Sequence, residues 1–544
     1  MQRRTTRVLA ASAATLTALS VAACGGGDSG GGGSSSGGDG DSLLIGTSDK
    51  ITTIDPAGSY DNGSFAVMNQ VYPFLMNTPL GSPDVEPDIA ESAEFTSPTE
   101  YTVTLKPGLT FANGNDLTSS DVVFTFERMV AINDPNGPAS LLYNLDSVEA
   151  TDDTTVVFTL KTADDQIFPQ ILSSPAGPIV DEDVFSADSL TSDDDIVSGN
   201  AFAGPYTITD YEINSLVSYQ ANPDYQGLLG APKTENVDVT YYADASNLKL
   251  DIEQGNIDVA FRSLSATDID DLRGNDDVEV VDGPGGEIRY IVFNFDTQPF
   301  GATTSEADPA KALAVRQAVA DLIDRQEIAD QVYRGTYTPL YSYVPDGLTG
   351  AATPLETLYG DGQGGPDADK AAQTLQAAGV QTPVQLSLQY SNDHYGPSSG
   401  DEYALIKDQL EATGLFQVDL QTTEWTQYSE DRTADVYPAY QLGWFPDYSD
   451  ADNYLTPFFL TENFLGNHYE NQQVNDLILQ QASTPDATER TALIEQIQQL
   501  VAQDLSTVPY LQGAQVAVVR SGVTGASDTL DASFKFRYGA LSAG

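Results

Sequence analysis

Two short segments of the chain alternate apolar and polar side chains with a period of two residues. Their sequences are Tyr101-Thr-Val-Thr-Leu105 and Thr155-Val-Val-Phe-Thr-Leu160, and both are rich in β-branched and aromatic residues. A period of two sends successive side chains to opposite faces of an extended chain. Both segments are therefore predicted to be β-strands.

Three other segments repeat apolar residues with the period of a helix. Thr118 and Asp121 form a capping-box pattern ahead of the first segment, and Asp308-Pro309 begins the second. The apolar positions recur mostly three or four residues apart: Val122, Val123, Phe126, Met129 and Val130; Val315, Val319, Leu322 and Ile323; Leu493, Ile497, Leu500 and Val501. We expect these stripes to face a core, in a protein of mixed α and β structure.

The first 23 residues have the pattern of a secretion signal. Three arginines precede a short apolar stretch that ends in small residues. The stretch is short and rich in alanine and threonine, whereas a membrane span needs about 20 strongly apolar residues. Val21-Ala22-Ala23-Cys24 resembles a bacterial lipobox, in which the cysteine thiol receives a lipid. We therefore interpret residues 1–23 as a lipoprotein signal peptide and Cys24 as the lipid attachment site.

The segment after Cys24 has the composition of a tether. Residues 24–42 are almost entirely Gly, Ser and Asp, which cannot bury enough apolar surface to fold. Cys24 is the only cysteine, so the body that follows has no disulfide, thiolate metal cluster or cysteine nucleophile. That body is about 500 residues long, too many for one hydrophobic core, and two or three lobes are expected.

The charge of the chain is strongly acidic. Without the three arginines ahead of Cys24, 20 basic side chains stand against 80 acidic ones. This balance argues against nucleic acid as a partner, because phosphate contacts need clustered lysine and arginine. The acidic residues are scattered, which is typical of a solvated surface rather than a site.

The sequence offers little catalytic chemistry. Its only histidines, His394 and His468, lie far apart, and neither belongs to a cluster with the spacing of metal ligands. We therefore expect neither a metal site nor a Ser-His-Asp hydrolase. A surface hydrolase of the glycosidase type needs only two facing carboxylates, so this alternative stays open.

One carboxylate stands among aromatic residues. In Gly443-Trp-Phe-Pro-Asp-Tyr-Ser-Asp450, Asp447 is surrounded by Trp444, Phe445 and Tyr448. A carboxylate in such surroundings favours a cationic partner, and aromatic faces add a cation–π attraction of about 0.5 to 2 kcal/mol. The pattern thus indicates a site for an ammonium group; a hairpin turn with a core tryptophan is the alternative.

Short motifs then follow one another along the body. The longest comprises Tyr101-Thr-Val-Thr-Leu-Lys-Pro-Gly-Leu-Thr-Phe111, Asn113-Gly114, Leu117-Thr118 and Asp121-Val-Val-Phe124. The others are Thr53-Ile-Asp-Pro56, Val71-Tyr72, Glu86-Pro-Asp-Ile-Ala-Glu91, Gly204-Pro-Tyr206, Asn222-Pro-Asp-Tyr225-Gln-Gly227, Gly255-Asn-Ile-Asp258, Phe293-Asn294, Arg316-Gln-Ala318 and Ile323-Asp324. In this order and spacing they resemble the extracytoplasmic solute-binding proteins of family 5, the peptide and nickel receptors of ABC importers.

The resemblance implies an α/β fold, a two-lobed periplasmic-binding-protein-like clamp (type II, cluster C-like) with an additional domain. Lobe I would comprise residues 43–77, 200–298 and 506–544, the additional domain residues 78–199, and lobe II residues 299–505. The lobes of such a clamp close on a ligand about a hinge. Proteins of this family bind solutes without catalysis, and no cofactor is expected.

The resemblance also implies partners and a location. We expect a monomer that is lipid-anchored on the outer face of a bacterial cell membrane. It would capture an oligopeptide and deliver it to an ABC permease. An oligosaccharide or a metal chelate is the alternative ligand within the family.

Individual site residues follow from the same resemblance. In oligopeptide-binding members, a Trp-x-x-Asp-Tyr motif supplies an aspartate for the α-amino group of the peptide, and Trp444-Phe-Pro-Asp447-Tyr448 matches it. Some members place a basic residue three positions before the tryptophan for the peptide carboxylate, whereas this chain has Gln441 there. Either another cation such as Arg432 serves, or the ligand has no carboxylate at that end. The remaining expected wall residues are Tyr60, Asp61, Asn62, Trp425 and Tyr428.

Overall fold

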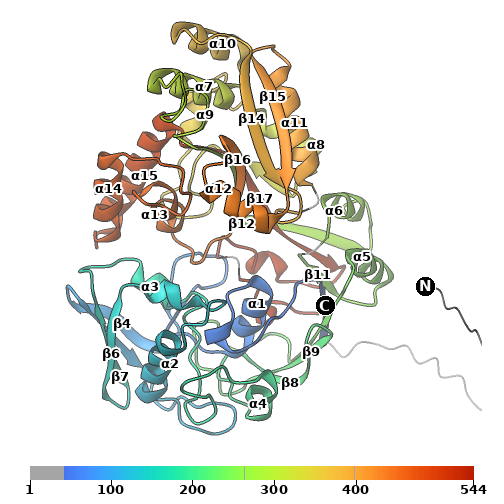
Figure 1. The fold of residues 1–544 in the computed structure, drawn as a ribbon. Helices are drawn as coiled ribbons and strands as arrows, with labels where there is room; N and C mark the ends of the chain where they lie inside the picture. The colour runs from blue at the N-terminus through green and yellow to red at the C-terminus, as the bar shows by residue number, and fades with distance from the viewer. Residues whose placement is uncertain (1–41, 263, 397, 534, 544) are drawn as a thin grey trace, which may run out of the picture. The chain divides into compact units, whose positions relative to one another are not determined.

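The computed structural model describes residues 42–262, 264–396, 398–533 and 535–543. Figure 1 gives the course of the chain and the labels of its helices and strands. The predicted signal peptide, Cys24 and all but the last residue of the predicted tether lie outside the described residues. Among the helices that the structure describes, none is both long enough and apolar enough to cross a membrane.

One large sheet of eleven strands organises the fold. Its strand order is β15 (Phe416–Thr423), β14 (Val384–Ser391), β16 (Ala439–Trp444), β12 (Val278–Phe293), β17 (Thr507–Arg520), β11 (Val259–Phe261), β1 (Ser42–Thr47), β10 (Asn236–Tyr241), β9 (Leu216–Ala221) and β8 (Tyr206–Glu212), and β13 (Tyr337–Pro339) pairs with β17 beside this path. The pairs β1–β10, β1–β11, β14–β15 and β14–β16 are parallel. The other pairs of the sheet are antiparallel.

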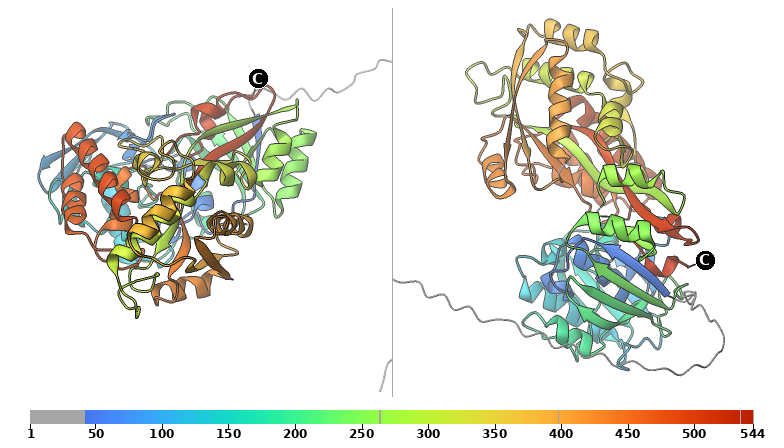
Figure 2. Two further views of the ribbon diagram at one scale, coloured as in Figure 1. Left: turned by 90° about the horizontal axis from the view of Figure 1, so that it is seen from above. Right: turned by 90° about the vertical axis from the view of Figure 1, so that its right-hand side faces the viewer.

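Two long antiparallel strands, β12 and β17, connect the two ends of this sheet. One half of their ladder, where Val278 pairs with Arg520, borders β11. The other half, where Val292 pairs with Thr507, borders β16. Figure 2 shows the two strands running side by side from one half of the molecule to the other.

A shift of register separates the two halves of this ladder, between Pro284 and Ile288. A Cβ atom at Gly285 would lie 2.2 Å from the carbonyl oxygen of Gly513, so only glycine fits there. Glycine and proline inside a strand commonly mark such a bulge, which bends the strand and increases its twist. The Gly283-Pro-Gly-Gly-Glu287 segment is thus a bulge in a strand that passes between two cores.

The first lobe is the body built on β1, β8, β9, β10 and β11. Its core contains Leu43, Val67, Tyr206, Val239 and Val259, all buried. Its helices are η1 (Pro56–Gly58), α1 (Asn62–Val71), α4 (Asp193–Ser198), α5 (Ala245–Gln254), α6 (Ala266–Leu272), η4 (Ala526–Asp528) and η5 (Tyr538–Ala540). The C-terminal segment, including Phe536 and Leu541, packs into this same core.

The four-stranded domain is the body built on an antiparallel sheet of order β4 (Ala90–Ser97), β5 (Glu100–Leu105), β7 (Thr155–Leu160) and β6 (Leu145–Asp152). It also holds α2 (Ser119–Ile132), η2 (Pro138–Leu142), α3 (Phe168–Ile171) and the small pair β2 (Met76–Asn77) and β3 (Glu86–Pro87). Its own core joins Phe126 on α2 to Phe158 on β7, with ring centroids 5.0 Å apart in an edge-to-face arrangement.

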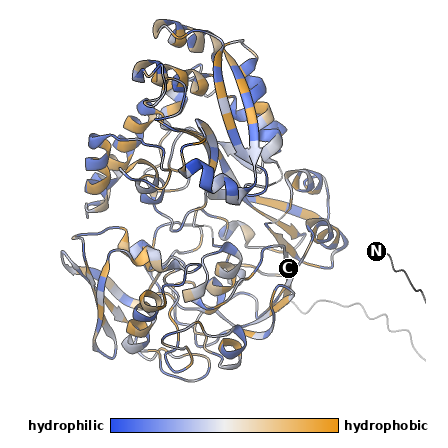
Figure 3. Cartoon of the chain, viewed as in Figure 1, coloured by the Kyte–Doolittle hydropathy of each residue, from blue (hydrophilic) through white to orange (hydrophobic). Residues whose placement is uncertain are grey.

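The second lobe is the body built on β14, β15 and β16. Its helices are α7 (Pro309–Leu322), α8 (Arg325–Gln331), α9 (Pro354–Leu358), α10 (Ala368–Ala377), α11 (Ser399–Glu411), α12 (Trp425–Thr433), η3 (Ala451–Tyr454), α13 (Thr456–Phe459), α14 (Gln472–Ala482) and α15 (Ala487–Asp504). Hydropathy alternates along β14 and β15 in Figure 3, as expected for strands with one buried face. The largest core of the described chain lies here.

The secondary structure predicted from periodicity is confirmed with one difference in detail. The two predicted strands are β5 and β7, and the three predicted helices are α2, α7 and α15. The capping box of Thr118 and Asp121 is formed. Val130, however, is 51% exposed, because a helical stripe through Val122, Phe126 and Met129 leaves the next position on its flank. The boundaries drawn for lobe I, the additional domain and lobe II stay predictions.

Candidate ligand-binding site

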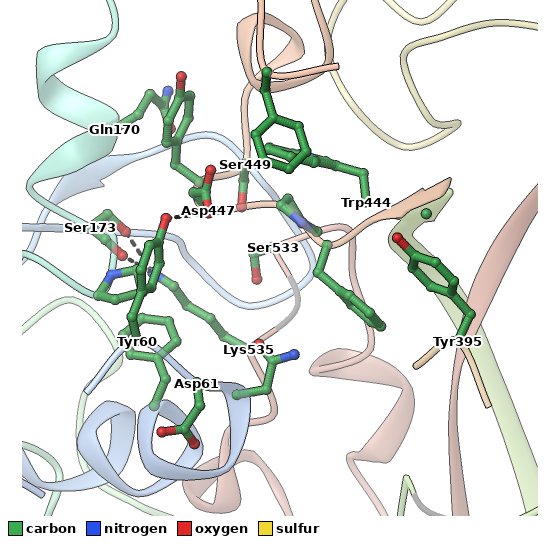
Figure 4. A pocket seen from close by; sticks show the side chains of 18 of the residues that line it. Tyr60, Asp61, Gln170, Ser173, Tyr395, Trp444, Asp447, Ser449, Ser533 and Lys535 are labelled. Carbon is green, nitrogen blue, oxygen red and sulfur yellow. Dashed lines mark hydrogen bonds between the residues drawn. The ribbon is translucent and has the colours of Figure 1, made fainter. Parts of the chain in front are cut away.

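A cavity of about 610 Å³ opens where segments of the two lobes and of the four-stranded domain meet. Figure 4 shows most of the side chains that line it. The first lobe contributes Tyr60, Asp61, Asn62, Phe65, Ser533 and Lys535. The four-stranded domain contributes Val85, Gln170, Ser173 and Pro175. The second lobe contributes His394, Tyr395, Trp425, Phe464 and residues 443–449. A volume of this size is ordinary for a site that encloses a small molecule.

Asn453 sets the conformation of the segment that carries Asp447. The strand β16 ends at Trp444, and η3 begins seven residues later with Asp450 as its N-cap. The side-chain oxygen of Asn453 accepts hydrogen bonds from the Trp444 indole N–H and the Asp447 backbone N–H, both at 2.9 Å. Its amide nitrogen donates to Asp447 Oδ2 at 3.1 Å. One buried amide thus orients both the tryptophan and the aspartate of the motif.

The carboxylate of Asp447 has neutral partners. Tyr60 donates its hydroxyl hydrogen to Asp447 Oδ1, and Asn453 donates to Oδ2. Neither of these two hydrogen-bond donors is cationic. Burial raises the pKa of Asp447 above its ordinary value, because removal from water disfavours the charged form. A half-buried carboxylate without a counter-ion is a suitable partner for an ammonium group brought by a ligand.

A second layer of charged groups supports this segment. Arg490 on α15 donates to both carboxylate oxygens of Asp450, at 2.8 and 2.6 Å. Asp452 accepts hydrogen bonds from Tyr448 at 3.1 Å and Thr456 at 2.7 Å. Bidentate pairs between arginine and carboxylate hold geometry as well as charge. The segment is therefore clamped to the second lobe at several points around Asp447.

Aromatic side chains cover the cavity wall on the second lobe. Trp444 meets Phe464 edge to face, with ring centroids 5.5 Å apart. Trp425, the first residue of α12, stacks on His394 at 3.6 Å between centroids. Burial lowers the pKa of His394. Sequence reasoning missed His394, since a lone histidine gives no signal until its stacking partner is known.

The structure brings most of the expected site residues to this cavity. Tyr60, Asp61, Asn62, Trp425, Trp444, Asp447 and Tyr448 all line it. The carboxylate of Asp61 caps α1, accepting from the Ser64 backbone N–H at 2.8 Å and from Thr52 Oγ1 at 2.6 Å. Figure 4 shows it pointing away from Asp447.

Three of the residues considered from the sequence do not line the cavity. Tyr428 is fully buried and donates its hydroxyl hydrogen to the carbonyl of Gln441 at 2.7 Å. Gln441 is also fully buried, and its side chain contacts Ser399 and Glu402 on α11. Arg432, the candidate for a carboxylate anchor, is buried and directs its guanidinium to the carbonyls of Phe464 and Leu465.

A second cavity of about 260 Å³ adjoins the first and shares Tyr395 and Phe445 with it. Arg289 on β12 lines this space and pairs with Glu287 at 2.9 Å. The rings of Tyr333, Tyr337 and Tyr395 lie within 6 Å of the Arg289 guanidinium carbon. This ion pair is enclosed by aromatic rings beside the main cavity.

One group of side chains in the described chain has the spacing of metal ligands. Oxygens of Asp296 and Asp435 and a ring nitrogen of His468 lie within 4.8 Å of one another. His468 is exposed, and its Nε2 lies 2.7 Å from Asp435 Oδ1. None of the three lines the main cavity. A hydrogen bond between His468 and Asp435 accounts for this contact.

Comparison with known proteins gives the family. Residues 84–466 match the bacterial extracellular solute-binding proteins, family 5, middle region. The chain is 25% identical over 483 residues to the probable D,D-dipeptide-binding periplasmic protein DdpA of Escherichia coli, covering 87% of this chain and 88% of the relative. It is 26% identical over 498 residues to heme-binding protein A of Haemophilus influenzae, covering 85% of each.

A solved structure has the same fold. The ABC transporter substrate-binding protein CtaP of Listeria monocytogenes superimposes with a TM-score of 0.75 at 25% identity, covering 92% of this chain and 98% of the other. The α/β two-lobed fold expected from the sequence is thus confirmed. Because the family match spans well over half of the chain, the protein belongs to the bacterial extracellular solute-binding proteins of family 5.

Proposed function

We propose that the protein is the solute-binding component of an ABC importer and that it captures a peptide with a free amino terminus. The observation that carries this proposal is Asp447, a half-buried carboxylate with aromatic neighbours and hydrogen bonds only to neutral groups. A peptide ammonium supplies the missing charge, and a desolvated ion pair costs a few kcal/mol to break. The dipeptide name of the Escherichia coli relative supports the ligand class.

Binding without catalysis is the simpler use of this cavity. A glycosidase-type site needs two free carboxylates that face each other across the substrate. Asp61 and Asp447 both line the cavity, but Asp61 is occupied with the cap of α1. Only one of these two carboxylates therefore remains for a ligand.

The location and the assembly belong to the same proposal. A diacylated Cys24 would hold the body beside its permease, since two acyl chains anchor stably where one does not. Residues 43–77, 200–298 and 506–544 would then move as one lobe against residues 299–505, about the hinge in β12 and β17. We propose a monomer as the working form.

Native mass spectrometry of the body with a mixture of di- to tetrapeptides tests the proposal. We expect intact peptides to be retained by the wild type. The Asp447→Asn variant should bind the same peptides at least tenfold more weakly by calorimetry, because the ammonium loses its counter-ion. Asp369→Asn, an exposed carboxylate on α10, is the matched control and should bind like the wild type. Equal affinity of Asp447→Asn and wild type would refute the role of Asp447, and hydrolysed peptides would indicate an enzyme.

A further inference from the structure

The cavity wall contributed by the first lobe and the four-stranded domain contains a buried lysine. Lys535, near the C-terminus, is 5% exposed and lines the cavity. Its ammonium donates to the carbonyl oxygen of Ser173 at 2.7 Å, to the hydroxyl of Ser173 at 2.6 Å and to Asn77 Oδ1 at 3.3 Å. Figure 4 shows the side chain reaching Ser173 past the ring of Tyr60.

All three acceptors of this ammonium are neutral, which is unusual for a buried charge. Arg537, a second buried cation, donates to the same Asn77 oxygen at 2.7 Å. The nearby carboxylate of Asp531 is engaged by the backbone N–H groups of Gly81 and Ser533. Burial, and the charge of Arg537, lower the pKa of Lys535, and they outweigh the opposite effect of the Asp531 and Asp88 carboxylates. An anion brought into the cavity would offset both effects.

Ser173 connects this charge to the space inside the cavity. Its hydroxyl oxygen accepts from Lys535, so its own hydrogen must turn to another acceptor. Ser173 lines the cavity just after the short helix α3. A hydroxyl that accepts from an ammonium becomes a stronger donor, because hydrogen bonds in a chain polarise one another. A carboxylate oxygen is the acceptor that gains most from such a donor.

We propose that Ser173 and Lys535 form the binding corner for the ligand's carboxylate while Asp447 holds its ammonium, so that the cavity selects a short zwitterionic peptide with both termini free. This inference rests on the proposed function. The ammonium end of the ligand would be held by the second lobe, and the carboxylate end by the four-stranded domain and the C-terminal segment. A ligand that carries both charges would thereby join the two sides of the cavity, and closure would depend on both ends.

The test compares a peptide acid with its C-terminal amide. A peptide retained from the di- to tetrapeptide mixture is synthesised in both forms, and each is titrated by calorimetry into the wild type, Ser173→Ala, Lys535→Met and Lys233→Met. In the wild type we expect the amide to bind at least tenfold more weakly than the acid. In Ser173→Ala and Lys535→Met this ratio should fall to within about threefold. Lys233 is an exposed lysine paired with Asp528 at 3.6 Å. Lys233→Met therefore removes one positive charge outside the cavity, and its acid-to-amide affinity ratio should equal that of the wild type.

Each outcome decides a different claim. Ser173→Ala removes one hydroxyl and stays informative even if Lys535→Met fails to fold, which thermal melting reports. An amide that binds the wild type within twofold of the acid overturns the carboxylate corner while the role of Asp447 stands. An unchanged acid-to-amide ratio in folded Ser173→Ala overturns it as well. If no peptide of the mixture is retained at all, the proposed function itself fails.

Discussion

The hydroxyl of Tyr60 donates a hydrogen bond to the carboxylate of Asp447, which lies 387 residues later in the chain. Tyr60 stands next to the N-cap of α1 in the first lobe, and Asp447 follows β16 in the second. The bond therefore joins the two lobes directly across the cavity. It also engages a carboxylate oxygen with which a ligand ammonium would pair under the proposed function.

Removal of this hydroxyl should change the equilibrium between open and closed lobes. A hydrogen bond to a charged group contributes about 1.5 to 3 kcal/mol. In Tyr60→Phe we expect the radius of gyration of the unliganded protein to rise in X-ray scattering, because the closed form loses this contact. A bound peptide should return the variant to the wild-type value, since the ligand then supplies the connection.

Tyr242→Phe is the control for this experiment, because the Tyr242 hydroxyl donates to Asp251 at 2.7 Å within the first lobe and does not cross the cavity. Its scattering should match that of the wild type with and without peptide. Identical unliganded profiles for Tyr60→Phe and wild type would show that the bond does not hold the lobes together.

The amide of Asn453 should be as important for binding as the charge that it orients. Asn453→Ala loses the hydrogen bonds to Trp444 and to Asp447 and leaves buried donors unpaired. We expect peptide affinity to fall at least tenfold and the free energy of unfolding to fall by about 1 to 3 kcal/mol. Calorimetry and denaturant unfolding measure the two effects.

Tryptophan emission gives an independent readout for this variant. The chain has two tryptophans, and both line the cavity. Emission from Trp444 should shift to longer wavelength when its indole loses Asn453. Asn392→Ala, at an exposed position, should leave emission and affinity unchanged. Wild-type affinity in a folded Asn453→Ala protein would contradict this account of the motif.

Peptide binding should weaken in mild acid because of Asp447. An ammonium ligand needs the ionised carboxylate, and burial raises the pKa of this group above its ordinary value near 3.9. Protonation therefore begins at a higher pH than for an exposed aspartate, and affinity falls as pH falls through the raised pKa. Calorimetric titrations between about pH 4.5 and pH 7 measure this. Asp447→Asn should bind weakly with little dependence on pH, whereas equal slopes for both proteins would assign the effect to another group.

Local patterns along the chain predict several individual strands and helices but not how distant strands pair in the sheet. Alternation over six residues identifies β7, and a capping box identifies the start of α2. The pairing of β12 with β17 joins segments more than 200 residues apart, and its bulge depends on how closely Gly285 approaches Gly513. Such approaches are decided by tertiary packing and leave no local periodicity.

The residues of the candidate site likewise fall into those that the local sequence indicates and those that only the tertiary structure brings together. Asp447 was identifiable because its aromatic neighbours are adjacent in sequence. Gln441 was expected at the site because it lies three positions before Trp444. Both residues belong to β16, and residues three apart in a strand face opposite sides of the sheet, so Gln441 points away from the cavity. Ser173 and Lys535 meet across more than 350 residues, so no motif contains them both.

The contribution of Asp452 to the stability of the protein should decrease as pH rises from about 4 to about 6. This carboxyl is buried, and desolvation raises its pKa to about 6, against about 3.9 in an unfolded chain. The folded state therefore binds the proton more tightly, so the contribution is fully present below the unfolded pKa and is lost as pH rises through the folded one. A shift of this size corresponds to about 3 kcal/mol.

Asp452→Asn carries no charge to bury, and its amide can still bond Tyr448 and Thr456. Relative to wild type, the variant should gain stability steadily across this window in denaturant unfolding, whereas Asp369→Asn should show a constant difference. A pH-independent difference for Asp452→Asn would mean that Asp452 keeps an ordinary pKa in the folded protein.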